Sequence, residues 1–106
     1  MTLAVRDVGD ACVVTTWNDV IDGAPRRILS VEDDFLIAWM AEETLQSAGL
    51  IVVGTAATFE DALALAGAER PDLVLMDIRL KSVRDGVEAA IEIRERFGIP
   101  SLFASA

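Results

Sequence analysis

One run of apolar residues that ends in a single aspartate constrains the fold of this chain more than any other feature. The range Leu73–Met76 follows Asp72 and leads directly into Asp77. An unbroken apolar run of this length predicts a strand that is buried on both faces, as in a parallel sheet covered by helices. Asp77 would then lie at the carboxyl end of that strand, which is the edge where open α/β sheets bind their ligands. Asp77 is therefore the first candidate for a functional residue.

A second strand candidate ends in a cluster of acidic residues. The range Arg27–Val31 is followed at once by Glu32, Asp33 and Asp34. If the two strands are parallel neighbours, their carboxyl ends meet at the same edge, so we expect Glu32, Asp33 and Asp77 to converge there. Carboxylates that lie so close together repel one another unless a cation neutralises them. Oxygen ligands alone favour a hard divalent ion, and the sequence therefore predicts a Mg²⁺ site.

Strand and helix patterns alternate along the rest of the chain, which predicts a parallel sheet with helices on both faces. Asp34 and Thr58 precede helical patterns as N-caps, and Gly49 and Gly67 are expected to end those helices. We expect strands at 27–31, 51–55, 73–76 and 101–104, and helices at about 34–48, 58–67 and 86–97. The apolar stripe expected to face the sheet from the first helix consists of Leu36, Ile37, Met40, Ala41, Leu45 and Ala48.

Composition and charge argue against several classes of function. The hydrophobic content of 53% is too high for a disordered chain, and the net charge of −9 argues against nucleic-acid binding. No run approaches the roughly 18 apolar residues that a membrane span needs, so we expect no membrane segment. The single cysteine, Cys12, permits no intrachain disulfide and fits a cytoplasmic location. Because the chain has no histidine, it is neither a histidine kinase nor a histidine phosphotransfer protein.

Three segments of the sequence, taken in their order along the chain, resemble the receiver domain of two-component response regulators. The segments that carry the resemblance are residues 28–34, 75–80 and 98–106, and the resemblance as a whole covers 26–106. It implies an α/β fold of the flavodoxin-like (CheY-like) type, a doubly wound parallel sheet. The implied spatial order of the strands is 51–55, 27–31, 73–76, 101–104. The family's fifth strand and last helices are expected to be missing, so that the receiver is C-terminally truncated.

The resemblance also implies roles for five residues. Asp77 would accept a phosphoryl group from the phosphohistidine of a histidine kinase or a histidine phosphotransfer protein. Asp33, Asp77 and the backbone carbonyl of Arg79 would bind Mg²⁺, with Glu32 acting through a water molecule. Ser105 would donate a hydrogen bond to a phosphoryl oxygen and act as the switch residue. The expected function is thus a phosphorelay receiver without enzymatic activity of its own.

Two other functions remain open at this point. The lysine of the family's fifth strand is missing, and the single lysine, Lys81, lies in the loop after Asp77. The chain could therefore be a degenerate receiver that works as a phosphorylation-independent interaction or dimerisation module. Haloacid-dehalogenase phosphatases also use an aspartate at a strand end, but they need a second aspartate two positions later, where this chain has Arg79.

Residues 1–25 lie outside the resemblance, and we expect an N-terminal extension that is either a docking strand or disordered. The range Ala11–Trp17 is rich in β-branched residues, and 3–5 could form a shorter strand. Without a fifth strand, Ser101–Ala104 would be an exposed edge that tends to pair with another strand. We expect Ala11–Trp17, or a second copy of the chain in a homodimer, to fill that edge.

Overall fold

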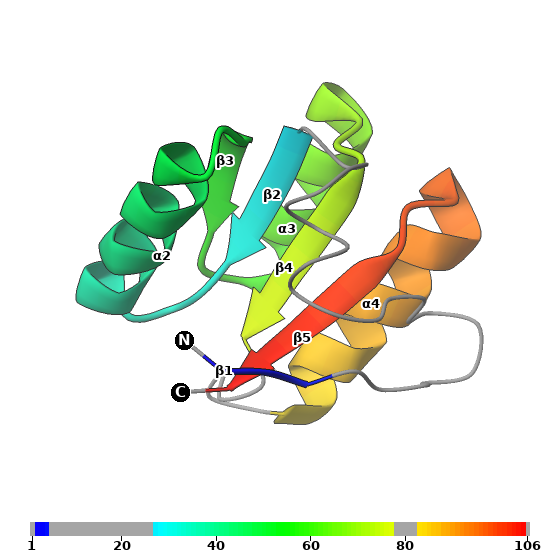
Figure 1. Ribbon diagram of the computed structural model, residues 1–106. Coiled ribbons are helices and arrows are strands. Elements are labelled where there is room, and N and C mark those ends of the chain that lie inside the picture. The colour runs from blue at the N-terminus through cyan, green and yellow to red at the C-terminus, as the bar shows by residue number, and fades with distance from the viewer. Residues whose placement is uncertain (1, 5–26, 78–82, 106) are drawn as a thin grey trace.

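The computed structural model describes residues 2–4, 27–77 and 83–105, and within them the chain forms one five-stranded sheet with helices on both faces (Figure 1). The strands are β1 (Thr2–Ala4), β2 (Arg27–Val31), β3 (Ile51–Ala56), β4 (Leu73–Asp77) and β5 (Ser101–Ser105). The helices are α2 (Phe35–Ser47), α3 (Phe59–Glu69) and α4 (Val83–Phe97).

The order of the strands across the sheet is β1-β5-β4-β2-β3. The last four strands of the chain, β2 to β5, run parallel to one another, whereas β1 runs antiparallel to β5. Apart from β1, this is the order that the sequence predicts, with β2 between β3 and β4. The carboxyl ends of β2 and β4 consequently lie side by side, as the convergence of their acidic residues requires.

The register between β2 and β4 is set at their amino ends by a reciprocal pair of hydrogen bonds. The backbone amide of Arg27 donates to Oδ2 of Asp72 at 2.9 Å, and the backbone amide of Asp72 donates to the carbonyl of Arg27 at 2.8 Å. The guanidinium of Arg27 also donates to the carbonyl of Glu69 at 2.6 Å. These bonds tie the end of α3 and the start of β4 to the first residue of β2. At the other end, Val31 is the last residue of β2 and pairs with Met76, one residue before β4 ends.

The helices begin where the sequence supplies caps. The Asp34 carboxylate accepts hydrogen bonds from the amides of Leu36 and Ile37, and the Thr58 hydroxyl accepts one from the amide of Asp61. These bonds satisfy amides in the first turn that have no partner within the helix. Both predicted N-caps are thereby confirmed. Gly49 follows α2 with a φ of +87°, a conformation that glycine adopts without strain.

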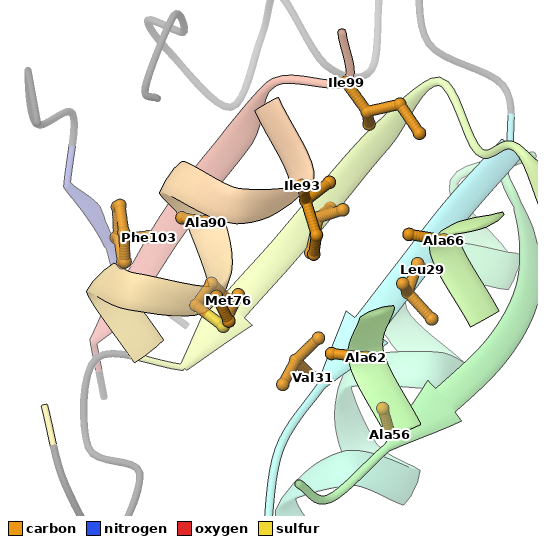
Figure 2. Packing of buried hydrophobic residues seen from close by; sticks show 12 residues of the cluster. Leu29, Val31, Ala56, Ala62, Ala66, Met76, Ala90, Ile93, Ile99 and Phe103 are labelled. Atoms are coloured by element: carbon orange, nitrogen blue, oxygen red, sulfur yellow. The ribbon is translucent and has the colours of Figure 1, made fainter. Parts of the chain in front are cut away.

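Two apolar clusters fill the space between the sheet and its helices. The larger one lies under α3 and α4 and brings together side chains from both helices and four strands (Figure 2). Its buried members are Leu29, Val31, Ala56, Ala62, Ala66, Val74, Met76, Ala89, Ala90, Ile93, Ile99 and Phe103. The smaller cluster, on the face that α2 covers, consists of Ile28, Leu45, Leu50, Leu73, Leu75 and Leu102. The central strands β2 and β4 contribute to both clusters, as expected for strands buried on both faces.

The predicted end of α3 and start of α4 need correction. Helix α3 continues past Gly67 to Glu69 and ends at Arg70, whose φ of 47° is left-handed. Gly67 instead marks a close approach between helices, because a Cβ there would stand 3.1 Å from Cζ of Phe97. Helix α4 begins at Val83 rather than at Gly86. In both cases the glycine that was expected at a helix boundary lies within the helix.

The predicted apolar stripe of α2 is only partly correct. Ala41 and Leu45 are buried, but Leu36 and Met40 are 60% and 55% exposed. The buried face runs instead through Ala38, Ala41 and Leu45. Leu45 packs in the smaller apolar cluster, and Leu36 and Met40 lie outside this buried face.

The outer edge of β5 is occupied by β1, which the sequence indicated only as a short candidate at residues 3–5. The range Ala11–Trp17, which we expected at this edge, lies outside the described residues and stays a prediction. Leu102, in β5, is fully buried.

None of the helices in the described part of the chain has the length and apolar character needed to cross a membrane.

Candidate functional site

The acidic residues that follow β2 and β4 lie at one edge of the sheet. Val31 pairs with Met76 at the ends of these parallel strands, and the next residues are Glu32 and Asp77. Asp77 is the last residue of β4 and pairs with Ala104 of β5. We call the site formed by Glu32, Asp33 and Asp77 at the carboxyl ends of β2 and β4 the carboxylate edge.

Glu32 is held firmly within the fold. It is only 6% exposed, and its backbone amide donates to the carbonyl of Ala56 at 2.8 Å, which extends the pairing of β2 with β3 by one bond. Its Oε2 accepts a hydrogen bond from the amide of Asp34 at 3.1 Å. A buried carboxylate needs such partners, because burying an unpaired charge is costly. The position of Glu32 is thus set by backbone contacts on two sides.

The three consecutive acidic residues after β2 have different surroundings. Asp34 caps α2 through Oδ1 of its carboxylate, which accepts from the amides of Leu36 and Ile37. Glu32 and the half-buried Asp33 line the same surface cavity, which has a volume of about 360 Å³. Of the three, Glu32 and Asp33 therefore remain as candidates for binding a cation.

The cavity beside the carboxylate edge is lined by both acidic and apolar side chains. Its lining residues come from the segment between β2 and α2, from α2 as far as its middle, and from the end of β3 and the residue after it: Glu32, Asp33, Phe35, Ala38, Trp39, Glu42, Thr55 and Ala57. Among the described residues of this lining, those that ionise are all acidic: Glu32, Asp33 and Glu42. A hard divalent cation or a positively charged partner would therefore be favoured here over an anion.

Next to the cavity, α2 exposes large apolar side chains. Phe35 is 86% exposed, Leu36 60%, Trp39 53% and Met40 55%, and we call these four residues the apolar patch. Exposed apolar residues that gather on one element often mark an interaction surface. This patch is not predicted from the sequence, because Leu36 and Met40 were expected to face the core. The signal that could have revealed it is the run 35–40, which is apolar around the whole helix.

The structure places the predicted site residues to different extents. Glu32 and Asp33 are described with their side chains, and Asp77 and Ser105 through the backbone of β4 and β5, of which they are the last residues. Arg79 lies outside the described residues. Ser105 follows directly after Ala104, the partner of Asp77, so the sheet brings Asp77 and Ser105 to the same edge.

The donors at the carboxylate edge suit Mg²⁺ by their chemistry. Glu32 and Asp33 offer only carboxylate oxygens, which hard divalent cations prefer, and the described residues that line the adjoining cavity carry neither thiol nor imidazole. Among the described side chains, no three His, Cys, Asp or Glu residues gather into a metal site. A site with three protein donors would need a contribution from Asp77 or from the loop after it, as the predicted ligand set implies.

Comparisons with known proteins agree with this topology. The family model of the response regulator receiver domain matches residues 28–106. The chain is 40% identical over 78 residues to the transcriptional regulatory protein PdtaR of Mycobacterium tuberculosis. The aligned residues cover 74% of this chain and 38% of PdtaR. It is 32% identical over 102 residues to the phyllosphere-induced regulator PhyR of Methylorubrum extorquens, covering 88% of this chain and 38% of PhyR.

A solved structure shows the same fold. The anti-anti-sigma factor PhyR of Bartonella quintana, in a co-crystal structure with the anti-sigma factor NepR, superimposes with a TM-score of 0.71 and 34% identity. The superposition covers 78% of this chain and 34% of that PhyR. The chain thus spans well under half the length of these relatives. Receiver domains are in general signalling modules rather than enzymes. Given the match over residues 28–106 and the flavodoxin-like sheet, this chain belongs to the response regulator receiver domain family.

Proposed function

We propose that this chain is a phospho-accepting receiver of a phosphorelay, in which Asp77 takes a phosphoryl group from a phosphohistidine on a partner protein. The observation that carries this proposal is the register of β2 against β4, in which Val31 pairs with Met76. It brings Glu32 and Asp33 to the edge at which β4 ends with Asp77. The names of PdtaR and PhyR, both regulators, support the same kind of role.

The proposed step is a phosphoryl transfer between two side chains. A carboxylate oxygen of Asp77 attacks phosphorus, the P–N bond of the phosphohistidine breaks, and the imidazole nitrogen keeps the electron pair and takes up a proton. Asp33, Asp77 and the carbonyl of Arg79 would hold Mg²⁺, with Glu32 acting through a water molecule. Bound Mg²⁺ would neutralise charge on the phosphoryl oxygens, which is a large part of catalysis in this reaction. The hydroxyl of Ser105 would donate a hydrogen bond to one of those oxygens.

We propose a histidine kinase or a histidine phosphotransfer protein as the partner. The apolar patch supports this part of the proposal, because it lies beside the cavity that Glu32 and Asp33 line. A protein docked on it would reach the carboxylate edge without crossing the sheet. We place the reaction in the cytoplasm, where the single cysteine needs no disulfide partner.

A second candidate function is a phosphorylation-independent interaction module. The apolar patch favours it as well, because Phe35 and Trp39 are exposed in the chain as it stands, before any modification. In that case docking alone would carry the function, and the acidic residues would only add charge to the surface. The two functions differ in a single observable, the chemical modification of Asp77.

Intact-mass spectrometry after incubation with acetyl phosphate and Mg²⁺ tests the proposal. We expect one phosphoryl adduct that requires Mg²⁺ and is lost in Asp77→Asn. Asp72→Asn is the matched control, because Asp72 lies just before the other end of β4. Asparagine there keeps an oxygen that can accept from the amide of Arg27. Absence of an adduct on a folded chain, shown by circular dichroism, would contradict phosphorylation and leave the interaction module.

A further inference from the structure

Strand β1 reaches the sheet beside the carboxylate edge. Its three residues pair with the last three of β5, Thr2 with Ser105, Leu3 with Ala104 and Ala4 with Phe103. Because the pairing is antiparallel, β1 begins where β5 ends, and Figure 1 shows it alongside the tip of the β5 arrow. The N-terminal segment therefore contacts the part of β5 that lies nearest to the proposed phosphorylation site.

A single row of backbone pairs connects β1 with the phospho-acceptor. Asp77 pairs with Ala104, and Ala104 pairs with Leu3 on its other side. The row beyond it contains Ser105 and Thr2. Neighbouring strands are roughly 4.8 Å apart, so Leu3 lies about two strand spacings from Asp77. A shift of the end of β5 toward β4 is thus a shift away from β1.

The two neighbours of β5 differ in how firmly they are held. On one side β4 forms four pairs with β5 and is buried within the sheet, with Val74 and Met76 fully inaccessible. On the other side β1 forms three pairs at the outer edge. Strands this short are marginal, and edge segments open at lower free energy than the core. If β5 moves so that it cannot pair with both neighbours, we expect its pairing with β1 to break before its pairing with β4.

We propose that β1 is a displaceable edge strand whose pairing with β5 is weakened when Asp77 carries a phosphoryl group. This inference rests on the proposed function, because it requires Asp77 to be phosphorylated. Ser105 would donate its hydroxyl to the phosphoryl group, and this contact draws the end of β5 toward β4. The pair between Thr2 and Ser105 is lost first, and the outer edge of Phe103–Ser105 becomes open to exchange with solvent.

Hydrogen exchange of the full chain, followed by mass spectrometry, tests the coupling. The sample is incubated with acetyl phosphate and Mg²⁺, and its intact mass reports the phosphoryl adduct at the same time. In the phosphorylated chain we expect exchange in the peptides that contain Thr2–Ala4 and Phe103–Ser105 to become about fivefold faster, a modest value for coupled sites. Peptides from β2 and α3 should not change, and Asp77→Asn should show no response.

The possible results separate this inference from the proposed function. An adduct without faster exchange in β1 overturns the coupling and leaves Asp77 as phospho-acceptor. Absence of an adduct overturns the proposed function, and the coupling with it. An adduct together with faster exchange at both strands supports both.

Coupling is reciprocal, so loosening β1 should favour phosphorylation. The double variant Leu3→Pro/Ala4→Pro removes two backbone donors. At least one of them faces β5, because successive amides point to opposite sides along a strand. In equilibrium with acetyl phosphate and acetate, we expect this variant to reach about a fivefold higher ratio of phosphorylated to unmodified chain than the Leu3→Val/Ala4→Val variant. Equal labelling of the two folded variants would overturn the inference. If the proline variant does not fold, the exchange experiment on the natural chain decides.

Discussion

The backbone amide of Asp34 donates a hydrogen bond to Oε2 of Glu32 at 3.1 Å. This bond connects the first acidic residue after β2 to the residue that caps α2, because Asp34 itself accepts from the amides of Leu36 and Ile37. The start of the helix and the wall of the cavity are therefore one local structure. A substitution of Glu32 or Asp34 should therefore alter the position of the other residue.

Asp34→Ala should destabilise the chain through loss of the helix cap. Without the carboxylate, the amides of Leu36 and Ile37 lose their acceptor, which typically lowers the free energy of unfolding by about 1 kcal/mol. Urea unfolding followed by circular dichroism measures the change. Asp34→Asn is the control, since asparagine caps helices about as well. If both variants unfold at the same urea concentration, the cap has no such role.

Glu32→Gln should weaken Mg²⁺ binding while preserving the fold. Glutamine keeps an oxygen that can accept from the amide of Asp34, but it removes one negative charge from the carboxylate edge. Residues that support the ligands of a metal typically change its affinity by about 10- to 100-fold, and we expect roughly tenfold here. Isothermal titration calorimetry measures it, with Glu60→Gln on the exposed first turn of α3 as control. Equal affinities in the two variants would remove Glu32 from the site.

Much of the fold could be predicted because its signals are local. The range Arg27–Val31 forms a strand with the predicted bounds, and β3, β4 and β5 each extend only one residue further than expected. Asp34 and Thr58 cap the helices that follow them. Short apolar runs and cap residues act over a few neighbouring positions, so the sequence displays them directly. The placement of Glu32 and Asp33 beside the end of β4 followed from the strand order.

The features that escaped prediction depend on contacts between distant segments. Leu36 and Met40 face outward because α2 packs on the sheet through a different face of the helix. The apolar residues of α2 lie on more than one face, so the sequence alone does not show which face is buried. Gly67 lies inside α3 because Phe97 of another helix comes close to it. The strand at Thr2–Ala4 was expected only as a short candidate at residues 3–5, because so few residues show no periodicity, and its pairing with β5 defines it.

Gly67→Ala should have an effect on stability that depends on Phe97. In the middle of a helix, alanine is favoured over glycine by about 1 kcal/mol, but here its Cβ would stand 3.1 Å from Cζ of Phe97. We expect the two effects to cancel to within about 0.5 kcal/mol in the natural chain. In a Phe97→Leu background, where the ring is gone, the same change should stabilise by about 1 kcal/mol. Chemical denaturation of all four chains gives the coupling, and an identical effect of alanine in both backgrounds would show that the ring does not crowd Gly67.

Trp39→Ala should slow phosphoryl transfer from a partner without affecting the chemistry at Asp77. Trp39 is 53% exposed within the apolar patch, so its removal should change the free energy of unfolding by less than about 0.5 kcal/mol. Labelling by acetyl phosphate, which needs no docking surface, should be unchanged. Transfer from a purified histidine kinase that labels the natural chain should fall by about tenfold, because tryptophan often dominates the energy of an interface. Ser47→Ala, at an exposed position in the last turn of α2, should leave both rates unchanged. If Trp39→Ala slows both reactions equally, Trp39 supports the site itself and the partner docks elsewhere.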